Sequence, residues 1–442
     1  MTGLPGNGWV IMIYLLYDLL LCLSALVLVP YYLLRGVRYG KTRRGIRERL
    51  GSYSKGLIAA LRGRQVIWVH AVSVGETRAA APLFKAIRQR YPEAVLLLSH
   101  VTETGREVAL KVAEADHCIF FPFDLSWLVR RSLRRIRPAV VILVETEIWP
   151  NFVRAARRQG IPVILVNGRI SDRSLPRYRL AGSILQQVLA GVSAFCMQTA
   201  QDARRIRLLG AAPEQILVTG NLKFDMPAPP AALAAQADLL EQFRLPLNAL
   251  VWVAGSTHPG EEEAVAEVYR QLLPRHPNLF LVLVPRHPER VRQVRDELAK
   301  RNLQVTLRSA LQGRQRALCP GEVLLVDTLG EMLTFYAMAD VVFVGGSLVP
   351  VGGHNILEAS LLSKPVLFGP HMQNFKEIAG LIRKAEGGLV VADRDDLYHQ
   401  LRLLIENPAE RRRLGENGYN LLQQNRGATE RTLAEIDRQL SR

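Results

Sequence analysis

The sequence predicts an α/β protein built from two doubly wound, Rossmann-like domains that face each other across a cleft, with a transmembrane helix at the N-terminus. A chain of 442 residues is too long for one ordinary core, so two domains of roughly 150–200 residues are expected. Short β-branched runs alternate with amphipathic segments, which indicates parallel sheets covered on both faces. A stretch rich in Pro and Ala, from Met226 to Ala237, interrupts this alternation and marks a domain boundary.

The strands expected in the first domain are near-continuous apolar runs. They are Val66 to His70, Ala94 to Ser99, Cys118 to Phe121, Val140 to Val144, Val163 to Asn167 and Ala194 to Met197. The helices expected between them are Arg78 to Tyr91, Thr104 to Ala115 and Leu125 to Ile136.

A second alternating series follows the boundary. Its expected strands are Leu250 to Ala254, Leu279 to Val284, Val323 to Val326, Val341 to Val344, Pro365 to Phe368 and Gly388 to Val391. Helices from about Asp395 to Leu440 close the chain. We therefore expect an anchor over residues 1–34, a first α/β domain over 35–225, a linker over 226–247 and a second α/β domain with C-terminal helices over 248–442.

The composition is that of a globular protein, with 49% hydrophobic and 22% charged residues. The four cysteines, Cys22, Cys118, Cys196 and Cys319, match no metal or redox spacing, so we expect them to be reduced, as in the cytosol. The formal net charge of +17 implies an anionic partner.

The segment from Trp9 to Val29 is apolar except for Asp18. Twenty-one helical residues span about 31 Å, close to the thickness of a bilayer core. Ten Lys or Arg residues follow between Arg35 and Arg64, against the single acid Glu48. The positive-inside rule then leaves everything after Arg35 in the cytoplasm. The alternative to a membrane anchor is a buried hairpin helix. Binding to nucleic acid is not supported, because the sequence has no motif of interleaved aromatic and basic residues.

A glycine loop between two expected strands predicts a phosphate site. Residues 352–358 (GGHNILE) follow the strand that ends near Ser347 and open a helix expected from Ile356 to Leu362. Such a unit presents unpaired backbone N–H groups to a phosphate at a helix N-terminus. Glu358 lies one helical turn past His354, within reach of a ribose hydroxyl. A tight turn without a ligand is the alternative.

Polar residues also follow the strands of the first domain, where ligands of such sheets bind. Glu76 starts the helix after the first strand, where N–H groups favour its ionised form; it is either a helix cap or a general base. Glu145 and Glu147 follow another strand and share a face if that strand continues. One of them could orient the base or the substrate; solvated loop acids are the alternative. Lys223 stands just before the boundary and could meet a phosphate.

In the second domain, the planar guanidinium of Arg286 could donate two hydrogen bonds to phosphate oxygens. His287 could form a hydrogen bond with the base or the ribose. Residues 327–331 (DTLGE) follow a further strand and open a helix. No Walker-type loop or GxGxxG fingerprint occurs, which argues against an ATPase, a kinase or an NAD enzyme. The only Asp-x-Asp, Asp393 to Asp395, reads as a helix cap rather than a metal site.

Together these segments closely resemble the bacterial Kdo transferases, which add 3-deoxy-D-manno-octulosonic acid (Kdo) from CMP-Kdo to the lipid A precursor. The likeness covers nearly the whole chain. It is carried by residues 70–76 (HAVSVGE), 144–151 (VETEIWPN), 220–225 (GNLKFD), 285–288 (PRHP) and 352–358.

The resemblance implies an inverting, metal-free glycosyltransferase of the GT-B type, without a cofactor, that works in lipopolysaccharide biosynthesis at the bacterial inner membrane. Glu76 would be the base, and Glu145 and Lys223 would support the transition state, although Glu147 stays open as the supporting carboxylate. The first domain would bind the acceptor and the second the CMP-sugar. The residues implied to hold CMP are Arg286, His287, Leu329, Gly330, Glu331, Asn355, Ile356, Leu357 and Glu358.

The implied partners are CMP-Kdo, the lipid A precursor and the anionic membrane surface, without nucleic acid. Two other functions remain as alternatives. A nucleotide-sugar 2-epimerase shares the paired-domain architecture, but gives no reason for an anchor. A non-catalytic membrane scaffold would explain residues 9–64 but not the polar strand ends.

Overall fold

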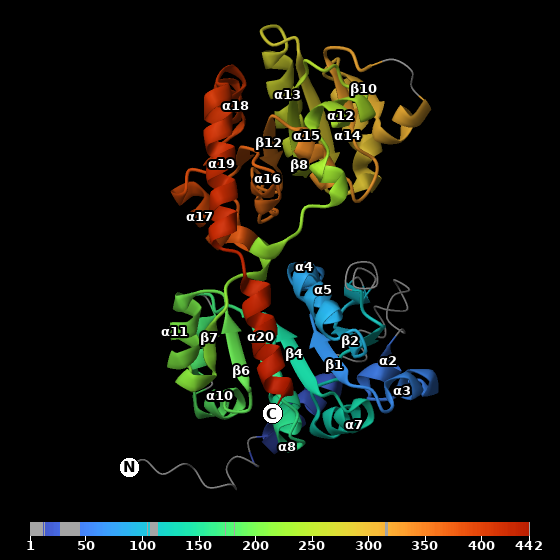
Figure 1. Ribbon diagram of the computed structural model, residues 1–442, viewed down its shortest axis with the longest axis vertical. Helices are drawn as coiled ribbons and strands as arrows, with labels where there is room; N and C mark the ends of the chain where they lie inside the picture. The colour runs from blue at the N-terminus through green and yellow to red at the C-terminus, as the bar shows by residue number, and fades with distance from the viewer. Residues whose placement is uncertain are drawn as a thin grey trace. The chain divides into compact units, whose positions relative to one another are not determined.

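The computed structural model describes residues 12, 14–26, 45–103, 105–106, 114–172, 174–180, 182–313 and 317–441. The chain forms two compact units (Figure 1). Unit 1 comprises the residues up to Met226 together with those from Arg426 onward, and unit 2 runs from Pro227 to Asn425. Each unit contains one seven-stranded sheet.

The sheet of unit 1 is entirely parallel, with the order β3-β2-β1-β4-β5-β6-β7. Its strands are β1 (Val66–His70), β2 (Val95–His100), β3 (His117–Phe120), β4 (Val140–Val144), β5 (Val163–Gly168), β6 (Ala194–Met197) and β7 (Ile216–Val218). The order reverses between β1 and β4. Ligands of doubly wound sheets bind beyond the strand ends at such a point.

Two apolar layers cover this sheet. Successive residues of one strand point to opposite faces of the sheet, so Ile67 belongs to one apolar cluster and Trp68 to the other. Both layers are filled mainly by Val, Leu, Ile and Phe, as expected for strands buried on both sides. The helices of unit 1 are α2 (Ile46–Arg49), α3 (Lys55–Leu61), α4 (Val74–Ala79), α5 (Ala81–Arg90), α7 (Ser126–Ile136), α8 (Pro150–Arg158), α9 (Leu175–Leu180), α10 (Gly182–Leu189), α11 (Ala200–Leu208) and α20 (Ala428–Leu440), with the short 3-10 turns η1 (Pro213–Gln215) and η2 (Leu222–Asp225).

Residues 14–26 are helical and belong to unit 1. The predicted transmembrane segment, Trp9 to Val29, extends beyond the described residues at both ends. Within the described ranges, no helix is both long and apolar enough to cross a bilayer.

Unit 2 repeats the architecture, with the parallel order β10-β11-β9-β8-β12-β13-β14 and a reversal between β8 and β12. Its strands are β8 (Leu250–Thr257), β9 (Leu279–Pro285), β10 (Gln304–Leu307), β11 (Glu322–Leu325), β12 (Val341–Val344), β13 (Val366–Phe368) and β14 (Gly388–Val390). Its helices are α12 (Gln236–Gln242), α13 (Glu261–Leu272), α14 (Val291–Ala299), α15 (Met332–Met338), α16 (Leu357–Leu361), α17 (Lys376–Lys384), α18 (Arg394–Glu406) and α19 (Pro408–Gln424), with 3-10 turns η3 (Pro230–Leu233), η4 (Pro288–Arg290), η5 (Arg308–Gly313) and η6 (Gln373–Phe375).

The last helix belongs to unit 1, whereas the sequence analysis assigned all residues after 248 to the second domain. Figure 1 draws α20 in red beside β4. Asp225 fixes its start, because the carboxylate accepts the N–H groups of Gly427 at 2.7 Å and Thr429 at 2.5 Å. Ala428 and Ile436 then complete the apolar layer of unit 1.

The expected linker, 226–247, is also mostly structured. Its Pro- and Ala-rich start contains η3, and α12 follows within unit 2. Leu239, Leu240 and Phe243 are buried, and the Phe243 ring lies 4.9 Å from that of Phe335. These apolar side chains fold the segment onto unit 2, although the Pro and Ala content suggested a tether.

Most expected strands are confirmed within one residue at each end. The exception is β8, which continues three residues beyond the expected end at Ala254. The helix expected from Arg78 to Tyr91 is two helices, α4 and α5, which meet at Ala80, and the one expected from Ile356 to Leu362 is the shorter α16. The helix expected from Thr104 to Ala115 lies mostly outside the described residues. Asp393 is a helix cap as predicted, because its carboxylate accepts the N–H groups of Asp395 and Asp396.

Candidate active site

Glu76 lies in the first turn of α4, beyond the end of β1. Its carboxylate accepts the Val72 N–H at 2.7 Å and the Ser73 hydroxyl at 2.9 Å. The Ser73 Oγ atom accepts the Glu76 N–H in return at 3.2 Å. This reciprocal pair is a capping arrangement, so Glu76 closes its own helix and is held in one orientation.

Burial raises the pKa of Glu76 to about 7, even though the bonds from Val72 and Ser73 favour its charged form. The nearby carboxylates of Glu145 and Glu147 raise it further. The sequence analysis expected the helix N-terminus to keep Glu76 ionised, but desolvation outweighs the N–H donors. A carboxylate with a pKa near 7 is matched to proton removal at neutral pH.

Glu145 and Glu147 lie beyond β4, which is the neighbour of β1 on the other side of the reversal. The strand ends at Val144, and Glu145 turns with a φ of 62°. The two carboxylates therefore belong to a turn and not to one strand face. Glu145 forms an ion pair with Arg169 at 3.5 Å, while burial and then the charge of Glu145 raise the pKa of Glu147.

Lys223 lies in the 3-10 turn η2, directly before Met226, where the chain passes from unit 1 to unit 2. Its N–H donates to the side-chain oxygen of Asn221 at 3.0 Å. Asn221 donates to Gln198, and Leu222 N–H donates to the Asn167 side chain, at 2.9 and 3.0 Å. The buried Asn167 and Gln198 thus hold the backbone that carries Lys223. The sequence analysis missed both residues.

Two buried histidines, His70 and His100, are the last residues of β1 and β2. The His70 Nδ1 atom lies 3.0 Å from the Ser99 Oγ atom, and His100 Nδ1 lies 2.7 Å from the Ala71 carbonyl oxygen. Burial lowers the pKa of His70 to about 3 and that of His100 to about 4. Both rings are therefore neutral near pH 7.

In unit 2, one buried glutamate joins the ends of β8 and β12. The Glu261 carboxylate accepts the N–H groups of His258, Gly346, Ser347 and Leu348 at 2.6 to 2.9 Å. A Cβ atom at Gly345 would lie 2.7 Å from the Glu261 Oε2 atom, so only glycine permits this approach. Glu261 thus holds residues 346–348 of the loop that follows β12, although its role was not predicted from the sequence.

His258, His287 and His354 gather around this loop. The Nε2 atoms of His258 and His354 are 2.9 Å apart, and their rings are stacked. The His258 and His287 rings meet edge to face, with centroids 5.8 Å apart. Burial, followed by His287 and Arg286, lowers the pKa of His258. The structure thus brings the segments 286–287 and 352–358 to one edge of the sheet of unit 2.

The remaining predicted residues occupy two helix starts in unit 2. Leu329 is 79% exposed, and Gly330 has a φ of 91° before α15. Glu331 binds Arg308 at 2.8 Å and accepts the Thr328 hydroxyl, so its carboxylate braces the turn. Asn355 accepts the Leu357 N–H at 3.3 Å, Ile356 and Leu357 are buried, and Glu358 is half-buried in the first turn of α16.

Comparison with known proteins decides the family. A family model described as 3-deoxy-D-manno-octulosonic-acid transferase (kdotransferase) matches residues 44–226. The 3-deoxy-D-manno-octulosonic acid transferase of Haemophilus influenzae is 35% identical over 94% of this chain and 96% of its own. The chain belongs to the Kdo transferase family. It is therefore a glycosyltransferase.

A second Kdo transferase, from Bordetella pertussis, is 38% identical over 84% of this chain and 86% of its own length. Among solved structures, a UDP-GlcNAc 2-epimerase from Neisseria meningitidis bound to UDP-GlcNAc is similar, with a TM-score of 0.57 over 85% of this chain and all of its own. That structure is 15% identical, so the likeness concerns the fold. The predicted resemblance to Kdo transferases is confirmed.

Proposed function

We propose that this Kdo transferase moves Kdo from CMP-Kdo to the lipid A precursor in lipopolysaccharide biosynthesis. The similarity to Kdo transferases over 94% of the chain supports this reaction. The observation that carries it is Glu76, a partly buried carboxylate with a pKa of about 7 at the reversal point of the unit 1 sheet.

In the proposed step, Glu76 removes the proton from an acceptor hydroxyl as its oxygen bonds to the anomeric carbon of Kdo. The bond from that carbon to the phosphate oxygen breaks, and CMP leaves as a phosphate monoester. Attack opposite the leaving group inverts the anomeric configuration. The hydrogen bonds from Val72 and Ser73 hold the Glu76 carboxylate in place before the reaction.

The charge that grows on departing CMP requires fixed donors. We assign this role to Lys223 and Arg286, with Glu145 orienting the transition state on the acceptor side. Preorganised positive groups can replace a metal ion in such a role, so we propose a metal-free reaction without a cofactor. Glu147, whose pKa is raised beside Glu145, is the alternative supporting carboxylate.

We propose that unit 2 binds the cytidylate and unit 1 the acceptor, as in glycosyltransferases of the GT-B type. The ring of histidines beside Arg286, the turn at Leu329, Gly330 and Glu331, and the start of α16 from Asn355 to Glu358 supply donors for phosphate, ribose and base. Glu358, in the first turn of α16, accepts a ribose hydroxyl in this scheme.

We place the enzyme at the bacterial inner membrane with its catalytic units in the cytoplasm. The acceptor is an acylated, anionic lipid, and the net charge of +17 favours its surface. The N-terminal segment that the sequence analysis expected to cross the bilayer provides the attachment. Residues 35–64 then lie beside anionic headgroups.

The two alternatives receive less support. Likeness to 2-epimerases is limited to the fold, whereas the relatives that are similar in sequence over most of the chain are transferases. A non-catalytic scaffold does not require a carboxylate tuned to a pKa of about 7.

Incubation of the purified protein with CMP-Kdo and lipid A precursor tests the proposal. Mass spectrometry should detect precursor that carries added Kdo, together with released CMP. Unchanged precursor, in a preparation that binds CMP, would contradict the assignment. Radiolabelled sugar that stays water-soluble as an isomer would favour the epimerase.

A further inference from the structure

The helix formed by residues 14–26 is attached to unit 1 along one side. The residues of that side are Tyr14, Tyr17, Asp18, Leu21, Cys22 and Ala25, all buried or half-buried at helical spacing. The Tyr17 hydroxyl donates to Asp124 at 3.2 Å. Asp18 accepts the Ser126 N–H at 3.1 Å and the Asn151 side-chain N–H at 2.8 Å.

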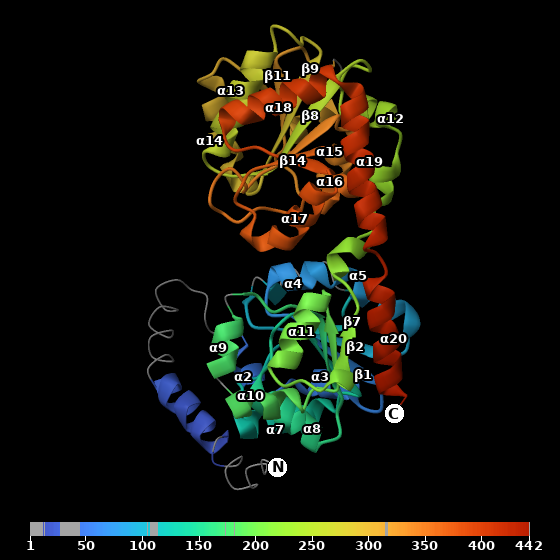
Figure 2. The same ribbon diagram turned by 90° about the vertical axis from the view of Figure 1, so that its left-hand side faces the viewer.

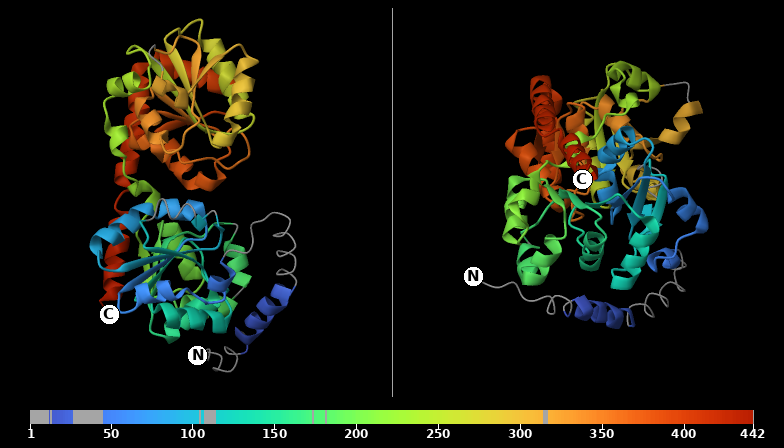
Figure 3. Two further views of the ribbon diagram at one scale, coloured as in Figure 1. Left: turned by 90° about the vertical axis from the view of Figure 1, so that its right-hand side faces the viewer. Right: turned by 60° about the horizontal axis from the view of Figure 1, so that its bottom comes forward.

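These polar contacts lie in the first half of the helix and bind it to the segment before α7 and to the starts of α7 and α8. Asp124, which receives the Tyr17 hydroxyl, is itself buried and also accepts the N–H groups of Asn151 and Phe152. Arg154 stacks over the Tyr14 ring, with its guanidinium carbon 4.0 Å from the ring centroid. These contacts hold the helix against unit 1, and Figures 2 and 3 draw it in dark blue at the edge of that unit.

The opposite side of the helix is apolar and exposed. Its residues are Met12, Leu15, Leu16, Leu19, Leu20, Leu23 and Leu26, each exposed by 51% or more. Water-facing stripes of this kind mark contact with a membrane or a protein. A helix with one apolar face and one face held by a protein has the geometry of an in-plane membrane contact.

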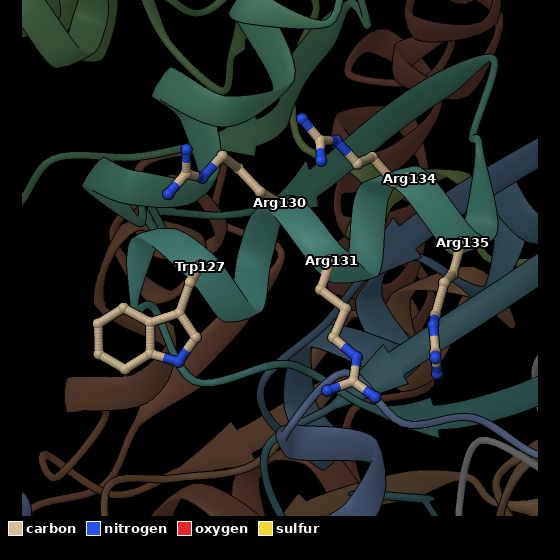
Figure 4. Close-up of a pocket in the computed structure, with 5 residues that line it drawn as sticks. All are labelled: Trp127, Arg130, Arg131, Arg134 and Arg135. Atoms are coloured by element: carbon tan, nitrogen blue, oxygen red, sulfur yellow. The ribbon is translucent and has the colours of Figure 1, made fainter.

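Positive charge is concentrated on two neighbouring helices, α7 and α8. Trp127, Arg130, Arg131, Arg134 and Arg135 form the outer face of α7, and all five are exposed (Figure 4). Arg154, Arg157 and Arg158 follow on α8. Among the described residues, no carboxylate forms an ion pair with any of these seven arginines.

The stripe and the arginines share one surface. A hollow of about 360 Å³ is lined by Leu15 and Asp18 of the N-terminal helix, by Trp127 and Arg130 of α7, and by Arg158 of α8. Leucines beside unpaired arginines and an exposed tryptophan match a bilayer, whose acyl chains lie below a layer of phosphates.

We propose that helix 14–26 and the arginine faces of α7 and α8 form one docking surface for an anionic phospholipid bilayer, with the helix lying in the plane of the interface. The leucines enter the acyl region, the arginines bind headgroup phosphates, and Trp127 lies between them. This geometry differs from the crossing orientation expected from the sequence, because a crossing helix would take Asp18 away from Ser126 and Asn151. Charge complementarity favours a bilayer over a second copy of this basic chain.

The proposed surface also lies close to the catalytic carboxylates along the chain. Asn151, which binds Asp18, is four residues after Glu147, and Trp149 between them packs against Phe121 with ring centroids 5.7 Å apart. Docking would thus set the turn that carries Glu145 and Glu147 beside the membrane in which an acylated acceptor resides. The docking surface itself does not depend on the chemistry of transfer.

Binding of the full chain to vesicles tests the charged half of the surface. Arg130→Glu/Arg134→Glu should weaken binding to vesicles of phosphatidylglycerol and phosphatidylethanolamine by at least about tenfold, with unchanged CMP binding. The matched control, Arg292→Glu/Arg412→Glu, reverses two exposed arginines of unit 2 and should bind the vesicles like the unmodified chain. Equal binding by all three proteins would overturn the proposal, as would equal losses for both double variants.

The orientation of the helix needs a depth measurement. Nitroxide labels at Leu16→Cys and Leu23→Cys, in a chain with Cys22→Ser and Cys319→Ser, should lie at the same shallow depth in these vesicles. A crossing helix centred near Leu19 would instead place both labels within about 6 Å of the bilayer midplane, since each residue rises 1.5 Å, and such deep positions would contradict the in-plane orientation. Labels that stay outside lipid while light scattering reports a dimer would assign the stripe to a second copy instead.

Discussion

The pKa of Glu76 is raised by burial and by the charges of two neighbouring carboxylates. Its hydrogen bonds to Val72 and Ser73 act in the other direction, because they stabilise the charge that burial penalises. The same bonds fix the carboxylate at the start of α4. One side chain thus serves as helix cap and as candidate base.

The raised pKa predicts a pH-dependent stability effect of Glu76→Gln. Below about pH 4.5 the carboxyl is protonated in both the folded and the unfolded chain, so burial carries no charge penalty. As the pH rises to about 7, the unfolded chain ionises first, and Glu76 lowers the free energy of unfolding of the unmodified protein. Glu76→Gln has no carboxyl to ionise, so its stability does not fall in this way. The difference in free energy of unfolding, variant minus unmodified protein, should therefore increase by roughly 1–3 kcal/mol between pH 5 and pH 8. Urea titrations at the two pH values measure it, and a difference that is constant with pH would contradict the raised pKa.

Removing either neighbouring charge should lower the pKa of Glu76. Glu145→Gln and Glu147→Gln should each move the midpoint of the pH–rate profile for Kdo transfer to lower pH, with the larger shift for Glu145, the stronger of the two influences. A large loss of maximal rate in only one variant would identify that residue as the supporting carboxylate. Midpoints that stay unchanged in both variants would exclude electrostatic coupling to Glu76.

At this scale the sequence predicted the residue types but not their environments. Glu76, Glu145 and Lys223 were candidates because they follow strand ends. The pKa of Glu76 could not be predicted, since it depends on how deeply α4 is buried. The supporting roles of Asn167 and Gln198 could not be predicted, because nothing in the sequence around an isolated amide indicates which group it will contact.

At the scale of elements, loops that follow strands carry the candidate site residues, and those with Glu76, Glu145 and Glu147 follow the two strands at the reversal point of unit 1. In unit 2, Glu261 at the first position of α13 ties the loop after β8 to the loop after β12. Four backbone N–H groups converge on one carboxylate, and an amide cannot accept all of them without bringing its own NH₂ donors against them. The loop geometry therefore depends on the charge of Glu261.

We expect Glu261→Gln to destabilise the protein by about 2–4 kcal/mol and to weaken CMP binding at least tenfold. Chemical denaturation and calorimetric titration with CMP measure the two effects. Glu263→Gln, on the same turn of α13, is the control and should change neither quantity by much. Normal CMP affinity in a folded Glu261→Gln protein would show that CMP binding does not depend on the loop segment 346–348 that Glu261 holds.

Long apolar strands such as Val140–Val144 were predictable because the run is buried on both faces. The edge strands β7 and β10 were not, since Val218 and Gln304 are exposed and their runs look like loops. The return of α20 to unit 1 depends on Asp225, 202 residues before the Gly427 N–H that it binds. Such a contact leaves no local pattern in the sequence.

For the whole molecule, positive charge is distributed in line with a reaction between two anionic substrates. In the proposed reaction the net charge of +17 would attract both the lipid surface and CMP-Kdo, and Lys223 and Arg286 lie in loops to which we assign a role in transfer. Because these cations are covalently part of the chain, we expect transfer to continue in excess EDTA at a rate within about twofold of that with Mg²⁺. Abolition by EDTA with recovery on adding Mg²⁺ would contradict the metal-free reaction.

The most direct test of the account is the single-turnover rate of Kdo transfer as a function of pH, measured for the unmodified protein and for Glu76→Gln. With Glu76 as the base, the rate should rise tenfold per pH unit below about pH 7 and level off above it. The variant should be slower by at least about 10²-fold at pH 8 and lack this rise, while still binding CMP. A Glu76→Gln protein that transfers Kdo at a near-normal rate with the same pH profile would show that another group removes the proton.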